Sequence, residues 1–459
     1  MCQLCFMHAY VSLNTLFYLA TVTAMAVSVA LFWFVGYDIR RAPNYLVTNW
    51  RWIVLYSALI LIATHAMMLA PTPPPGSHCV ETQHVWGPLE MVLSCDSKQF
   101  VASARQPATL LEYQSWNQAR PLGVMVASLL TRVEAGVLKN HHPYGVRLQP
   151  GWLPYIMLNF LLLLVSLMIF KRLNAPTSVT AAAVVAVLSV FLVFSDVVKG
   201  FFWSAHTQMW NMLMPLLSIA LSCSLLRRPV RSSLFMAATG LLLGIGLLAY
   251  GSLIVCAVSA VIAIVVGVWI NRERPPLAQL IGKLFVFLAA FAAPVLTWIA
   301  FVTRVTGVFF SPEAKIFRQF VWVDDAWKAD ELADRSRIYL IEFSMHLAQV
   351  LWPALVLFAI VLFVRLVAPD RLRETMKERS HLLIAAGIVF AVCLVFFYLM
   401  GFYRNRLEFN VVMPLLVVAS TLLTGVVDRL PRKQTVMTLI ALAAVAFITS
   451  ALLRVTWPY

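Results

Sequence analysis

Charged residues are scarce in this chain. They make up 12% of its 459 residues, whereas 61% are hydrophobic, and the mean hydropathy is +0.84. A water-soluble domain of this length could not cover its surface with so few charges, so lipid must solvate much of the chain. Acidic residues are the scarcer kind, 20 against 35 lysines and arginines, and the net charge is +15. The basic residues gather at the ends of apolar runs, which argues for membrane topology and against a nucleic-acid partner.

Cysteines are also few, and no cleavable secretion signal is expected. The first ten residues lack a positive n-region, and the first apolar run is of spanning length. Five of the seven cysteines lie in or near apolar runs, where free thiols are the ordinary expectation. Cys79 and Cys95 lie instead in a long polar loop. In an oxidising compartment they are candidates for a disulfide, the alternative being two free thiols.

Long apolar runs are what the sequence has in abundance. A span needs about 20 apolar residues to cross roughly 30 Å of hydrocarbon, and in lipid the backbone must pair within each helix. We therefore expect an all-α, polytopic integral membrane protein with about twelve transmembrane helices, forming one transmembrane domain over residues 1–459. The predicted spans are 14–36, 52–70, 152–170, 178–195, 206–226, 233–250, 252–270, 284–303, 349–364, 382–400, 410–427 and 435–453.

Lysine and arginine divide the connecting segments into two alternating sets. The short loops of one set hold 19 of the 35 basic residues in about 65 residues, and the other set holds 16 in about 165. Short basic loops face the cytoplasm, so both termini and the long segments are predicted to lie outside.

Two outer segments are too long to be simple connectors: 71–151 and 304–348. Within them, 98–115, 121–138 and 313–345 mix apolar and charged residues at helical spacing. These three stretches are predicted to form helices at the membrane interface.

Ionisable residues on the outer side suggest a chemistry. A carboxylate can act as a general base on a hydroxyl group, and fixed cations can stabilise a departing phosphate. Taken singly, these residues have ordinary explanations, such as a solvated acid, an interfacial arginine or a helix cap. The candidates are Asp96, Glu112, Arg120, Lys199, His206, Tyr403, Arg404 and Arg406.

The order of motifs resembles the polytopic GT-C glycosyltransferases. Residues 96–104, DSKQFVASA, resemble the acid and helix start of that family's first outer loop. Residues 118–122, QARPL, resemble the opening of its second interfacial helix, and 206–209, HTQM, the polar entry to a later span. The glycine-rich stretch 240–248 and the arginine-then-proline stretch 403–414 complete the resemblance. Two predicted spans precede the acidic loop, where the family usually has one.

This resemblance implies an inverting transfer of a sugar from a polyprenyl-phosphate donor to a glycan, lipid or protein acceptor of the cell envelope. Its active site would face the periplasm or exterior of a plasma membrane, with a bacterial inner membrane expected. The acid stands alone rather than in a pair, so we expect no cofactor and a metal-independent mechanism, although a divalent cation stays open. The implied roles are catalytic base for Asp96, donor-phosphate binding for Arg404, Arg406, Arg120 and Lys199, and substrate binding for His206, Glu112 and Tyr403.

Two other functions compete with this one. An O-antigen-type polymerase or ligase also has about a dozen spans, and His141, His142 and Arg147 would suit its chemistry. A transporter or flippase would carry acids near mid-bilayer or an inverted repeat. No predicted span has an acid near its centre, so the transporter ranks third.

Overall fold

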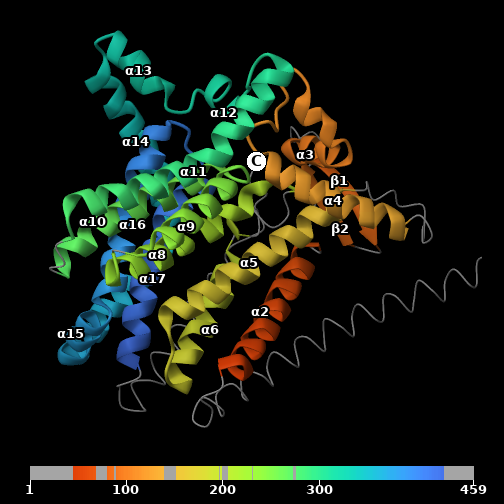
Figure 1. The fold of residues 1–459 in the computed structure, drawn as a ribbon. Helices are drawn as coiled ribbons and strands as arrows, with labels where there is room; N and C mark the ends of the chain where they lie inside the picture. The colour runs from red at the N-terminus through yellow and green to blue at the C-terminus, as the bar shows by residue number, and fades with distance from the viewer. Residues whose placement is uncertain are drawn as a thin grey trace, which may run out of the picture.

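The computed structural model describes residues 45–68, 80–86, 89–138, 151–195, 197–198, 205–229, 231–271 and 275–427. Within these ranges the chain is helical apart from one two-stranded sheet (Figure 1). Seven helices are long and apolar enough to cross a membrane, as expected of a polytopic membrane protein. These are α5 (Trp152–Asn174), α8 (Trp210–Arg227), α10 (Ile254–Ile270), α11 (Leu277–Thr306), α14 (Leu332–Val367), α16 (Ser380–Met400) and α17 (Asn405–Val427).

Three further predicted spans coincide with shorter apolar stretches: Trp50–Thr64 within α2 (Tyr45–Met68), α6 (Val179–Phe194) and α9 (Ser233–Leu247). The predicted spans 14–36 and 435–453 lie outside the described residues. The total of twelve therefore stays a prediction. The predicted break between 233–250 and 252–270 is confirmed, because α9 ends at Leu247 and the 3-10 turn η3 (Gly251–Leu253) precedes α10.

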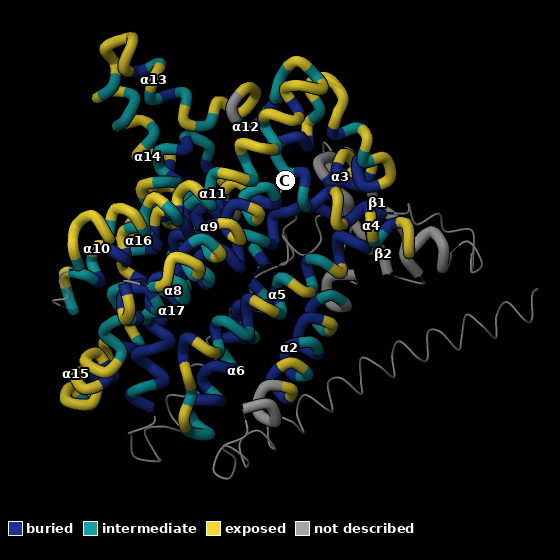
Figure 2. Tube along the Cα trace, viewed as in Figure 1, coloured by how far each residue is buried: buried dark blue, intermediate teal, exposed yellow. Residues whose placement is uncertain are grey.

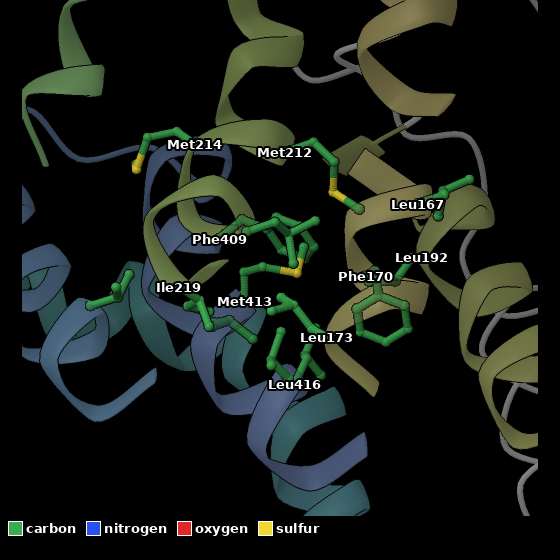
Figure 3. Close-up of a cluster of buried hydrophobic side chains, with 14 of the residues drawn as sticks. Leu167, Phe170, Leu173, Leu192, Met212, Met214, Ile219, Phe409, Met413 and Leu416 are labelled. Atoms are coloured by element: carbon green, nitrogen blue, oxygen red, sulfur yellow. The ribbon is translucent and has the colours of Figure 1, made fainter. Parts of the chain in front are cut away.

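The core lies where α8 and α17 pack together. In their most apolar stretches 72% and 83% of the residues are buried, against 11% in α11. Figure 3 shows apolar side chains from α5, α6, α8 and α17 converging in this region, and Figure 2 shows both central helices mostly buried. Asn410 of α17 donates a hydrogen bond to Asn211 of α8 at 3.1 Å, and both side chains are fully buried. This polar contact joins the two central helices near their N-terminal ends.

Glycines set the close packing of α9 against α11. A Cβ atom at Gly240 would lie 2.3 Å from the carbonyl oxygen of Phe287, and one at Gly244 would lie 2.2 Å from that of Phe291. The two glycines are four residues apart, so they share one helix face and let the backbones approach.

The first outer segment contains a hairpin that the sequence analysis missed. Strands β1 (Val80–Trp86) and β2 (Leu89–Ser94) pair antiparallel, with Val80 opposite Ser94. Helix α3 (Cys95–Arg105), the 3-10 turn η1 (Pro107–Leu111) and helix α4 (Pro121–Leu138) follow. Helices are thus found over most of 98–115 and over the predicted 121–138.

The second outer segment differs from its prediction in extent. Helix α12 (Pro312–Lys315) and helix α13 (Val321–Lys328) are short, and α14 then runs unbroken through the predicted boundary at 348. The 36 residues of α14 extend about 54 Å, well beyond a hydrocarbon core of roughly 30 Å. The helix continues because Phe343 packs against Tyr398 of α16, while Tyr339 packs against Trp322 of α13 and Tyr403 after α16, so its packing face extends beyond the apolar span.

Segments predicted on the same side of the membrane meet at the same end of the bundle. At one end, the Arg379 guanidinium after α15 (Pro369–Glu378) donates to the carbonyl of Ala175 at 3.3 Å. At the same end, Asn271 donates to the carbonyl of Leu226 at 2.6 Å. In Figure 1, α15 lies at the lower left of the view, α12 and α13 lie at the top, and α3 and α4 lie on the right above α2. This grouping agrees with the predicted alternation of loops.

Candidate functional site

Arg120 is the residue at which distant parts of the chain meet. It directly precedes α4, and its backbone N–H donates to the carbonyl of Asn117 at 3.0 Å. Its Nη1 lies 3.4 Å from Nε2 of His206 and 3.5 Å from Oγ1 of Thr207. Its guanidinium also lies over the ring of Tyr250, 5.4 Å from the centroid. Two separate parts of the bundle, the residues just before α8 and the turn after α9, therefore fix this cation.

The imidazole of His206 accepts a hydrogen bond in this arrangement. An arginine only donates, so Nε2 of His206 accepts, and in the neutral tautomer the ring proton then lies on Nδ1. The ring of Phe100 in α3 packs against the imidazole at a centroid distance of 4.2 Å. Gly123 allows the close approach, because a Cβ there would lie 2.7 Å from Cγ2 of Thr207. The site thus joins α3 and α4 to the start of α8.

A carboxylate from the second outer segment completes the cluster. Oε1 of Glu313 in α12 lies 2.5 Å from Nη2 of Arg120, and 80% of each side chain is shielded from solvent. Ser311 donates to the other carboxylate oxygen of Glu313 at 3.0 Å. The sequence analysis did not single out Glu313, because no local pattern reveals a partner 193 residues away.

Gln118 holds the two outer segments together beside Arg120. Its side-chain oxygen accepts from the backbone N–H of Phe310 at 3.0 Å, and its side-chain nitrogen donates to the carbonyl of Glu112 at 2.7 Å. The indole of Trp298 in α11 donates to the carbonyl of Gln118 at 2.8 Å. Gln118 is fully buried, so these contacts are shielded from water. Of the predicted substrate residues, Glu112 presents an exposed side chain at this junction.

Several predicted site residues lie outside what the structure describes. Asp96 has its backbone in the first turn of α3, one turn before Phe100, but its side chain is not described. Lys199 and Cys79 fall outside the described residues, and for Arg406 and Cys95 only the backbone is described. The roles predicted for these five residues therefore stay predictions. The alternative candidates, His141, His142 and Arg147, also fall outside.

Tyr403 and Arg404 lie in the turn between α16 and α17. The hydroxyl of Tyr403 donates to the carbonyl of Tyr398 at 2.8 Å, and burial raises the pKa of the phenol well above its usual value. Tyr403 is 5% exposed, which suits a structural side chain better than a substrate contact. The side chain of Arg404 is exposed and lies 5.5 Å from the ring of Phe402. Glu408 accepts from the backbone N–H of Arg404 at 3.0 Å, so it caps α17 and leaves the guanidinium reachable.

The cluster can hold an anion and relay a proton, since it combines a fixed cation, an imidazole and a carboxylate. Among the described residues, no three His, Cys, Asp or Glu side chains form a group that could hold a metal ion. The metal-independent mechanism stays a prediction.

The cluster formed by Arg120, His206, Thr207 and Glu313 is the candidate site, because it joins three segments far apart in the sequence at one end of the bundle. Comparisons with protein-family models, with characterised proteins and with solved structures find no match to this chain.

Proposed function

We propose that this protein is a membrane glycosyltransferase, similar in design to the GT-C enzymes, that uses a polyprenyl-phosphate sugar as donor. The observation that carries the proposal is the meeting of Arg120, His206 and Glu313 at one end of a polytopic helical bundle. In the proposed topology this end of the bundle would lie at the membrane surface, where a lipid-linked phosphate can reach it. The acceptor would be a cell-envelope glycan, lipid or protein.

The proposed reaction is a single displacement. Asp96 takes the proton of an acceptor hydroxyl, whose oxygen attacks the anomeric carbon of the donor sugar. The bond from that carbon to the phosphate oxygen breaks, and polyprenyl phosphate leaves with the electron pair. Arg120 stabilises the departing phosphate through its fixed guanidinium, and Arg404 and Arg406 are proposed to add positive charge toward the same phosphate.

The proposed orientation of the protein in the membrane places the short basic loops in the cytoplasm. In this twelve-span topology the candidate site faces away from the cytoplasm. Single cysteines test this orientation in a background from which the native cysteines are removed. Tyr113→Cys, at a side chain that is 70% exposed, should react with an impermeant maleimide added to intact cells. Lys377→Cys in α15 should react only after permeabilisation. The reverse pattern would place the site on the cytoplasmic side.

The catalytic proposal is tested by Asp96→Asn in protein reconstituted into nanodiscs. Radiolabelled polyprenyl-phosphate sugars serve as donors and a cell-envelope extract as acceptor, and released polyprenyl phosphate is measured. A general base contributes roughly 10²–10⁴-fold, so turnover should fall by that factor while donor binding is kept. The matched control is Asp324→Asn, an exposed acid paired with Lys328 in the second outer segment. Full turnover by Asp96→Asn would remove Asp96 from the chemistry.

A further inference from the structure

The contacts of Arg120 fall into two kinds. His206, Thr207 and Tyr250 belong to the helical bundle and hold the guanidinium from one side. Glu313 belongs to α12, a helix of only four residues, and reaches Nη2 through its side chain alone. The contacts with the bundle fix the guanidinium in place. The Glu313 carboxylate occupies the N–H groups of that guanidinium to which an anion would bind.

The carboxylate of Glu313 is the contact through which α12 reaches Arg120, so its release would loosen this four-residue helix. The neighbouring Phe310 is anchored separately, since its N–H donates to Gln118. The carboxylate is held otherwise by the hydroxyl of Ser311, on the same short segment. A change of side-chain rotamer at Glu313 would therefore free Nη2 of Arg120.

Both side chains of the pair are within reach of a ligand. Arg120 and Glu313 are each 20% exposed, so the contact lies at the surface of the cluster rather than in the sealed core. The N-terminus of α4, an 18-residue helix, directly follows Arg120 and adds positive potential. A phosphate carries more charge than one carboxylate and matches the same guanidinium fork.

From this geometry we propose that Glu313 is a built-in occupant of an anion site at Arg120, and that the phosphate of the incoming ligand displaces it. The inference rests on the proposed function, because it takes the donor phosphate to be that ligand. Glu313 then acts as a competitor that keeps the site neutral until a phosphate group arrives. Its charge lowers affinity for every phosphate that binds at Arg120.

The test is phosphate binding to Glu313→Gln in nanodiscs of neutral phosphatidylcholine. The probes are inorganic phosphate and a polyprenyl phosphate, and the matched control is Glu331→Gln, an exposed acid paired with Arg335. Removing the competing charge should tighten binding of both probes by about fivefold, the equivalent of a weak ion pair. The control should match the wild type, and Arg120→Ala should abolish the gain. Unchanged or weaker binding by Glu313→Gln, with a lower unfolding temperature, would make the pair a structural bridge and overturn the proposal.

A second measurement uses the native pair and does not depend on that variant folding. A spin label at Lys315→Cys, an exposed position at the end of α12, reports the mobility of the segment. Saturating phosphate should increase the mobility of the label, and no change at saturation contradicts displacement.

The outcomes also separate this inference from the proposed function. If both phosphates bind as expected but no polyprenyl-phosphate sugar is turned over, the displacement of Glu313 is supported and glycosyl transfer is rejected. If Asp96→Asn loses turnover as proposed but Glu313→Gln and the wild type bind phosphate with equal affinity, glycosyl transfer is supported and displacement of Glu313 is rejected. Equal affinity for inorganic and polyprenyl phosphate would assign the site to a soluble phosphate and remove the lipid-linked ligand.

Discussion

The two outer segments use their polar residues in opposite ways. In the first, Arg120 and Gln118 bond to residues up to 193 positions away and are largely shielded from water. In the second, Glu313 is the long-range partner of Arg120, but the charged residues beyond α12 pair locally: Arg318 with Asp325 and Lys328 with Asp324, within seven positions and at the surface. Asp324 raises the pKa of Lys328, as expected of a local pair. Exposed local pairs contribute little to stability or binding, so a binding site is expected at the shielded contacts of Arg120 rather than along α13.

Within the second segment, helix α13 is attached to the bundle by an aromatic residue. The ring of Trp322 stacks on Tyr339 at a centroid distance of 4.4 Å, and its indole N–H donates to the carbonyl of Leu399 at 2.9 Å. Gly401 has a φ of +69°, and a Cβ there would lie 2.3 Å from Cδ1 of Trp322. Gly401 therefore allows both the left-handed backbone conformation of the turn and the close approach of the Trp322 indole.

The largest effect on stability is expected from removal of the Trp322 side chain. Trp322→Ala should lower the free energy of unfolding by about 3–5 kcal/mol, because it empties a buried site and removes a hydrogen bond. Trp327→Ala on the same short helix removes a side chain that is 73% exposed and should change little. Unfolding in mixed micelles and limited proteolysis of 316–331 measure both variants. Equal behaviour of the two tryptophans would contradict the proposed anchor.

The second effect concerns the hairpin of the first segment. Val80 and Ser94 are paired across its strands and are the chain neighbours of Cys79 and Cys95. Closing a 16-residue loop stabilises by about 3 kcal/mol, so reductant should lower the unfolding temperature. Peptide mapping without reductant should find the linked pair, and alkylation of both thiols under those conditions would rule it out.

Gln118 gives a third and smaller effect. Gln118→Leu leaves the N–H of Phe310 and the carbonyl of Glu112 without their bonds, which should cost about 1–3 kcal/mol. Gln106→Leu changes an exposed glutamine whose side chain makes no cap bond, and it should be near neutral. The same unfolding assay compares them. A neutral Gln118→Leu would mean that the outer segments are not joined through this side chain.

The smallest effect is expected at Arg404. Its guanidinium is exposed beside Phe402, so Arg404→Ala should weaken binding of a polyprenyl-phosphate sugar by about fivefold, roughly 1 kcal/mol, and Arg404→Lys by less. Donor titrations in nanodiscs measure this. Wild-type affinity in both variants would make Arg404 an interfacial anchor.

The sequence predicted the helices better than the segments that carry the site. Apolar runs locate α5, α8, α10 and α16 within a few residues, since lipid demands long apolar helices. The hairpin over 80–94 escaped notice because its strands carry polar and apolar residues without strict alternation. The predicted interfacial stretch 313–345 proved to hold two short helices and the start of α14.

For the candidate site, the residue types were predictable and the partnerships were not. Arg120 and His206 were both singled out from the sequence, and the structure brings them together. Glu313, Thr207 and Tyr250 were not, because tertiary packing rather than local spacing puts them beside Arg120. A basic residue before a predicted interfacial helix was the one available signal.

Binding of a polyprenyl-phosphate sugar to Arg120→Ala tests the central claim most directly. The variant is compared in nanodiscs with Arg318→Ala, which removes an exposed arginine paired with Asp325 in the second outer segment. A charge-assisted bond to phosphate is worth about 1.5–3 kcal/mol, so Arg120→Ala should weaken donor binding by roughly 10- to 100-fold and lower turnover with it. Arg318→Ala should match the wild type in both. Wild-type donor affinity in Arg120→Ala, or an equal loss in the two variants, would contradict a phosphate site at Arg120.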